Sequence, residues 1–189
     1  MLSGFCWSLG KKHVKRGLMV FGSGLLITVV TLLVMPENRV VFGVLTLTGS
    51  CMLLMIGLEK VVCRISAPVG LIVSLCLFVV TRNVNSGYLG FEGLNLYKLP
   101  EVWYQGYTAA YLGFPPASFY STDYFSLIPW LFLFISGYFL YRIFEQRELM
   151  HSDAFGIKLA PFTFLGRHSL LIYLLHQPVL YLIGMLVFA

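Results

Sequence analysis

The sequence predicts an all-α fold: a polytopic transmembrane helix bundle of about five spans, with one loop carrying an interfacial segment. Two observations lead to this prediction. Of the 189 residues, 58% are hydrophobic and only 11% are charged, whereas a typical soluble domain carries about 25% charged residues. The apolar residues also gather in stretches close to the roughly 20 residues that a helix needs to cross a bilayer. Both an ordinary soluble domain and a disordered chain are therefore excluded.

The predicted spans are separated by charged or proline-containing turns. The first ends at Pro36, the second ends at Glu59, and the short third span is closed by Arg82. The spans cover residues 17–35, 40–58, 67–81, 125–144 and 169–188, and residues 82–124 form a long loop. We interpret residues 1–189 as one membrane domain.

The Lys and Arg residues orient these spans. If the basic run at residues 11–16 is cytoplasmic, ten basic residues lie at the cytoplasmic ends of the spans and three at the other ends. The three are Arg39, Arg82 and Lys98. Because cytoplasmic loops of membrane proteins are enriched in Lys and Arg, we expect an integral membrane protein with its basic loops in the cytoplasm. The net charge of +5 then reflects topology, and we expect no nucleic-acid partner, only the lipid bilayer.

Two further segments carry predictions. The loop 82–124 holds seven of the eleven tyrosines and also Trp103, and aromatic residues at this density are typical of a membrane interface. Within it, residues 100–114 are predicted to form a helix lying in the membrane plane. Residues 1–10 are apolar but too short to span, and we interpret them as the cytoplasmic end of a helix whose earlier part is missing.

The last span has the strongest polar pattern. Ser169, Tyr173 and His176 recur at helical spacing and so share one stripe of a helix. Pro178 cannot donate a backbone hydrogen bond, which predicts a kink and a freed carbonyl at Leu174. One interpretation is a polar site inside the bundle. The other is that these side chains only bond to neighbouring helices and fix their packing. The residues alone do not separate the two.

Asp123 also has two interpretations. Ser121 or Asp123 is placed to cap the fourth span, because a side-chain oxygen there accepts from unpaired backbone N–H groups. Alternatively, Asp123 faces a vestibule and orients a polar substrate. We expect no metal site, since His168 and His176 are eight residues apart and the spans contain no carboxylate suited to join them.

Several motifs resemble one family of membrane enzymes. The run from Phe164 to Pro178, which reads FLGRHSLLIYLLHQP, resembles the C-terminal signature of the bacterial heparan-α-glucosaminide N-acetyltransferase catalytic-domain family. The family's loop and following helix resemble the segments Leu112–Pro115, Ser121, Asp123–Phe125 and Pro129–Trp130. Weaker matches in the first two spans extend the resemblance over essentially the whole chain.

The resemblance implies a function. Members are multi-span acyltransferases, and the eukaryotic relative transfers acetyl from cytosolic acetyl-CoA to a glucosamine amine. It implies acetyl-CoA or another acyl-CoA as donor, a glycan or other small molecule as acceptor, and a bacterial plasma membrane. His176 and Asp123 are the candidate catalytic residues. The candidate substrate-binding residues are Tyr173, Gln177, Arg167 and His168, with Arg167 and His168 near the CoA phosphates.

The family also has an earlier helix with an acidic residue, an Arg-Gly pair and a histidine proposed to be catalytic, and this sequence starts after it. We therefore expect an N-terminally truncated member, in need of that missing portion or of an oligomer partner. The alternative is a non-catalytic membrane protein or partner subunit that retains the fold.

Overall fold

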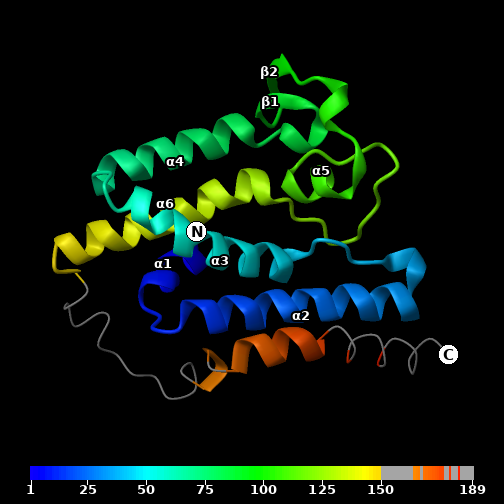
Figure 1. Ribbon diagram of the computed structural model, residues 1–189, viewed down its shortest axis with the longest axis horizontal. Helices are drawn as coiled ribbons and strands as arrows, with labels where there is room; N and C mark the ends of the chain where they lie inside the picture. Colours follow the sequence, from blue (N-terminus) through cyan, green and yellow to red (C-terminus); the bar gives the residue numbers. More distant parts are fainter. Residues whose placement is uncertain (150–163, 167, 177–178, 180–182, 184–189) are drawn as a thin grey trace. The chain divides into compact units, whose positions relative to one another are not determined.

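The computed structural model describes residues 1–149, 164–166, 168–176, 179 and 183, and Figure 1 shows its elements. The chain divides into two compact units, Met1–Arg147 and Glu148–Ala189, each described by itself. The helices of the first unit are α1 (Leu2–Ser8), α2 (His13–Val34), α3 (Val44–Val62), α4 (Ala67–Thr81), α5 (Gly106–Leu112) and α6 (Leu127–Gln146). Its shorter elements are the 3-10 helices η1 (Pro36–Asn38), η2 (Val84–Ser86) and η3 (Glu101–Trp103), and the strands β1 (Tyr88–Phe91) and β2 (Leu94–Lys98).

Among the residues that the structure describes, four segments are long and apolar enough to cross a membrane. They are α2, α3, the stretch Ala67–Ser86 that contains α4 and η2, and α6. The predicted helical, membrane-like fold is thus confirmed, while the predicted count of about five spans is not. Of the fifth predicted span, 169–188, the described residues 169–176 are helical, and most of the remainder lies outside the described residues.

The helix bounds differ from the predicted spans for local reasons. α2 begins four residues earlier, at His13, because Lys15 and Arg16 are good helix formers with side chains long enough to reach the membrane surface. α3 begins four residues later, at Val44, because Phe42 has φ +57°, which a helix cannot continue.

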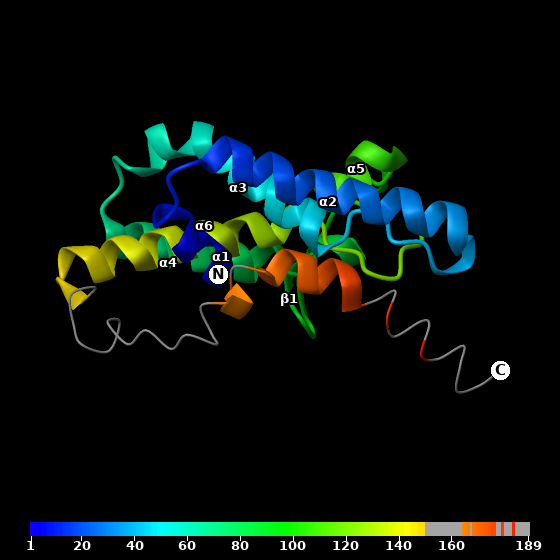
Figure 2. The ribbon, with the colours of Figure 1, turned by 90° about the horizontal axis from the view of Figure 1, so that it is seen from below.

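Three helix pairs make the largest contacts within the first unit, and α3 also packs on α6. α2 packs on α3, α4 packs on α6, and the short α1 packs on α6, as Figures 1 and 2 show. A Cβ on Gly137 would clash with the carbonyl of Met1, and one on Gly4 would clash with the carbonyl of Phe134. Glycine is therefore required where the backbones of α1 and α6 touch. Met55, Cys51 and Phe139 are among the buried side chains of this core.

The loop 82–124 is more ordered than the sequence indicates. The segment predicted as one helix, 100–114, contains η3 and α5. Before it, β1 and β2 form an antiparallel hairpin, with a register shift between Leu89 and Gly90. The hairpin was not predicted, because β2 is exposed along its whole length and shows no buried alternation.

Candidate functional site

Two segments distant in sequence pair at the end of the bundle where α3 and α6 begin. We call residues 39–44 and 120–125 the clamp, and this end of the bundle the loop end. The Ser121 hydroxyl accepts from the Val41 N–H and donates to the Val41 carbonyl, both at 2.9 Å. The other bonds join Thr122 N to Arg39 O (3.1 Å), Phe125 N to Phe42 O (2.9 Å) and Arg39 Nε to Tyr120 O (3.2 Å). The clamp thereby fixes the starts of two spans against each other.

Asp123 lies inside the clamp, at the start of α3. Its Oδ2 accepts from the backbone N–H of Val44 at 3.5 Å, and a Cβ on Gly43 would come within 3.0 Å of the same oxygen. A carboxylate here is favourable, since the N-terminus of a helix carries partial positive charge. The prediction that Ser121 or Asp123 caps the fourth span is wrong. α6 has Ser126 at its N-cap position without a side-chain cap, and Asp123 serves α3 instead.

Two tyrosines connect α5, in the loop 82–124, to α3 and to the clamp through hydrogen bonds. Tyr111 of α5 donates to the Ser50 hydroxyl, which donates in turn to the Thr46 carbonyl, both at 2.5 Å. Tyr124 donates to the Ala110 carbonyl at 2.5 Å. Burial raises the pKa of Tyr124 to about 12, so its hydroxyl remains a donor at neutral pH. Sequence reasoning missed this network, although a serine inside an apolar span was the signal for it.

The opposite end of the bundle is basic. Arg142, near the end of α6, donates through its Nη1 to the carbonyls of Val62 (3.4 Å), which ends α3, and of Ile65 (2.9 Å), three residues later. Other cationic side chains at this end are exposed: Lys11, Lys12, Lys15, Arg16, Lys60 and Arg64. Such a set suits multiply charged anions such as phosphates.

In the second unit, Tyr173 and His176 lie together on one helical segment. The Nδ1 of His176 is 2.5 Å from the Tyr173 carbonyl oxygen, and the two ring centroids are 5.1 Å apart. A carbonyl oxygen can only accept, so Nδ1 carries the hydrogen. In the neutral imidazole, Nε2 then holds a lone pair that can take up a proton.

His168 also contacts a backbone carbonyl and an aromatic ring of a residue that precedes it in the chain. Its Nδ1 is 3.0 Å from the Phe164 carbonyl oxygen, and the Phe164 and His168 rings are 4.5 Å apart. Two further candidates, Arg167 and Gln177, lie outside the described residues, as does the predicted kink at Pro178.

The candidate residues therefore fall into separate groups. Tyr173 and His176 are brought together within the second unit, whereas Asp123 belongs to the first. Among the residues that the structure describes, no group of three or more His, Cys, Asp or Glu side chains is placed to hold a metal ion.

In the described part of the chain, four apolar segments of membrane-crossing length indicate an integral membrane protein. Residues 1–178 match the family described as heparan-alpha-glucosaminide N-acetyltransferase, catalytic. The chain belongs to that family. No match was found among curated proteins or among solved structures.

Proposed function

We propose that this protein transfers an acyl group, acetyl in the simplest case, from acyl-CoA to an amine or hydroxyl of a small acceptor, with glycans among the candidates. Family membership over residues 1–178 supports acyl transfer in a membrane. The observation that carries the proposal is the contact between His176 Nδ1 and the Tyr173 carbonyl oxygen. With Nδ1 as the donor in this contact, Nε2 is the basic nitrogen.

The reaction needs a base of this kind. The acceptor must lose a proton as its nitrogen or oxygen attacks the thioester carbonyl. A C–N or C–O bond forms, the C–S bond breaks, and CoA leaves as a thiolate that takes up a proton. His176 Nε2 would accept the acceptor's proton and return it to the leaving sulfur. Tyr173, and Gln177 next in the chain, would bind the acceptor beside it.

The donor would be held through its phosphates. The exposed cationic side chains at the basic end of the bundle suit that role. The family resemblance also makes Arg167 and His168 candidates for binding the CoA phosphates. We place this end in the cytoplasm of a bacterial cell, at the plasma membrane, because cytoplasmic loops are the basic ones.

Asp123 is the second catalytic candidate, and its contacts favour a different role. Its carboxylate contacts the N–H that begins α3, at 3.5 Å, where the N-terminus of the helix favours a negative charge. We therefore propose that Asp123 is a positioning residue, which holds the starts of α3 and α6 together without touching the reacting atoms.

The test is transfer by the full chain in phosphatidylcholine vesicles. Labelled acetyl-CoA is supplied with glucosamine as probe acceptor, followed by a panel of other amino sugars and alcohols. We expect labelled product from the wild type, its loss in His176→Ala, and its retention in Leu175→Ala, which changes an exposed neighbour on the same helix. Absence of product from the wild type with every acceptor would instead support a non-catalytic membrane protein or partner subunit.

A further inference from the structure

The hairpin in the loop exposes apolar side chains outside the four candidate spans. Leu94 and Leu96 of β2 are each 72% exposed, and Val102 of η3 is 74% exposed. We call these three residues, together with the exposed Tyr97 and Trp103, the hairpin patch. Several exposed apolar side chains in one short segment indicate a contact with a partner or with a membrane.

The hairpin patch is held firmly at the end of α4. The backbone N–H of Asn83 donates to the Gly90 carbonyl at 3.1 Å, and its side-chain nitrogen donates to the Glu92 carbonyl at 2.6 Å. At the base of the hairpin, Leu99 N–H donates to the Gly87 carbonyl at 2.8 Å. The patch therefore has a fixed depth relative to α4.

That depth follows from where α4 ends. The end of α4 stands beside the first turn of α6, since the Arg82 guanidinium lies 5.3 Å from the centre of the Trp130 ring. The Ser126 hydroxyl, just before α6, donates to the Asn85 side chain at 2.9 Å. α4 itself is short, because its 15 residues rise about 22 Å. The chain thus leaves α4 level with the start of α6, and the start of a span marks the boundary of the hydrocarbon.

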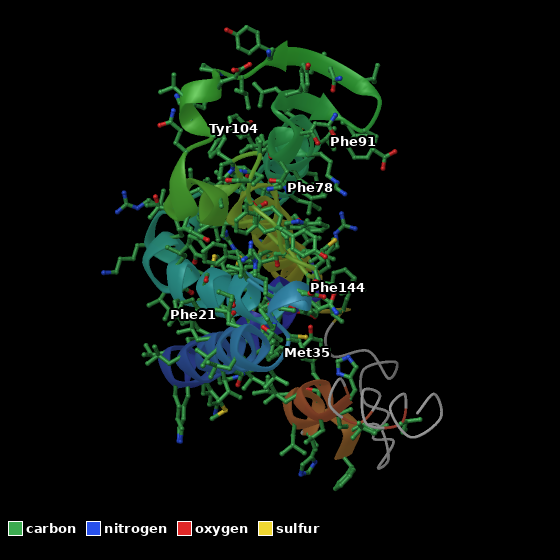
Figure 3. All side chains as sticks on the ribbon, turned by 90° about the vertical axis from the view of Figure 1, so that its right-hand side faces the viewer. Phe21, Met35, Phe78, Phe91, Tyr104 and Phe144 are labelled. Atoms are coloured by element: carbon green, nitrogen blue, oxygen red, sulfur yellow. The ribbon has the colours of Figure 1, made fainter. Side chains whose placement is uncertain are left out.

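From this boundary the hairpin runs sideways. Figure 1 shows β1 and β2 above the end of α4, displaced to one side of the helices. Figure 3, which looks along the helices, places the hairpin past α4 on the side away from α2. A segment that projects sideways from a spanning helix at this depth meets lipid.

We propose that the hairpin patch inserts into the interfacial layer of the leaflet at the loop end and anchors the short span α4 there. The composition fits that layer, because Leu, Tyr and Trp side chains bury their apolar parts at the level of the headgroups. The ion pair between Lys98 and Glu101 (3.0 Å) stays exposed, as headgroups and water allow. The proposal does not depend on the proposed enzymatic function.

The test places an environment-sensitive fluorophore on the full chain in phosphatidylcholine vesicles. Cys6, Cys51, Cys63 and Cys76 are replaced by serine or alanine, and Leu96→Cys is labelled with a nitrobenzoxadiazole dye. Glu37→Cys is the matched control. It lies at the same end of the bundle, but after α2, whose 22 residues rise about 33 Å and clear the hydrocarbon. Both positions are exposed, and circular dichroism verifies that the labelled chains keep their helices.

We expect the dye at position 96 to emit further to the blue than at position 37. It should be quenched by lipids brominated near the ester groups and protected from aqueous iodide, with the reverse at position 37. Equal quenching by iodide at both positions would overturn the proposal, since the hairpin would then lie in water. A blue-shifted dye at position 96 that neither quencher reaches would also overturn it, because the patch would then contact a second protein chain.

Discussion

The clamp at the loop end and the helix that carries His176 are both rich in polar residues, yet their contacts differ. In the clamp, Ser121 and Asp123 bond to backbone groups that begin α3 and α6. In the helix, one ring nitrogen of His176 contacts a backbone carbonyl of its own helix, and the other ring nitrogen makes no such contact with the residues that the structure describes. The comparison teaches that polar residues of the two regions differ in their partners: the clamp orders the backbone at the starts of two spans, whereas we propose that the helix supplies a proton acceptor.

The largest effect should separate the two histidines of the helix. His176→Ala should lower kcat about 100-fold to 10,000-fold, the usual contribution of a general base. His168→Ala should raise the KM for acetyl-CoA and leave kcat within a few-fold, because we assign His168 to the donor phosphates. Steady-state transfer assays in vesicles measure both constants. Equal losses of kcat in the two variants would contradict the assignment of proton transfer to His176 and of donor binding to His168.

The next effect concerns the stability of the clamp. Ser121→Ala removes the group that pairs with both the N–H and the carbonyl of Val41. Leaving these half-buried groups unpaired should lower the free energy of unfolding by about 1–3 kcal/mol. Thermal unfolding in detergent measures the change. Thr122→Ala is the control, since the bond described for Thr122 is made by its backbone, and a loss as large in the control would contradict the role of the Ser121 hydroxyl.

The smallest effect is a dependence on alkaline pH. The pKa of Tyr124 is raised by burial to about 12 from an ordinary value of 10.0. The unfolded chain therefore loses this proton first as the pH rises. The contribution of the Tyr124 hydroxyl to the free energy of unfolding is fully present below pH 10 and declines as the pH rises toward 12. Unfolding midpoints measured across this range should fall less steeply in Tyr124→Phe than in the wild type; parallel curves would rule out Tyr124 as the source.

Much of the helical arrangement follows from composition and periodicity. α4 has the bounds predicted for the third span, 67–81, because a proline at its start and a run without charges define both ends locally. The start of α3 was misplaced, since the positive φ of Phe42 depends on pairing with a segment about 80 residues away. Local pattern cannot contain that information.

In the candidate sites, too, local contacts could be predicted from the sequence and long-range contacts could not. The spacing of Tyr173 and His176 predicts that they share a helix stripe, and the contact between their rings is a local one. The partner of Asp123 was predicted wrongly, because a polar residue before a span suggests a cap on that span, whereas tertiary pairing brings the carboxylate to α3. The link between Tyr111 and Ser50 joins residues far apart in sequence and had no local signature beyond the serine itself.

The most direct test measures rate and stability together in His176→Ala and Asp123→Asn. Both variants are reconstituted with the wild type in phosphatidylcholine vesicles. Acetyl transfer from labelled acetyl-CoA is followed below the unfolding midpoint, and the midpoint itself is recorded for each. We predict that His176→Ala loses transfer at an unchanged midpoint. Asp123→Asn should retain transfer and have a lower midpoint, in keeping with roughly 0.3–1 kcal/mol for a negative charge removed from a helix N-terminus. Full transfer by His176→Ala would contradict the role of the helix in proton transfer. Loss of transfer by Asp123→Asn at an unchanged midpoint would contradict the purely structural role of the clamp.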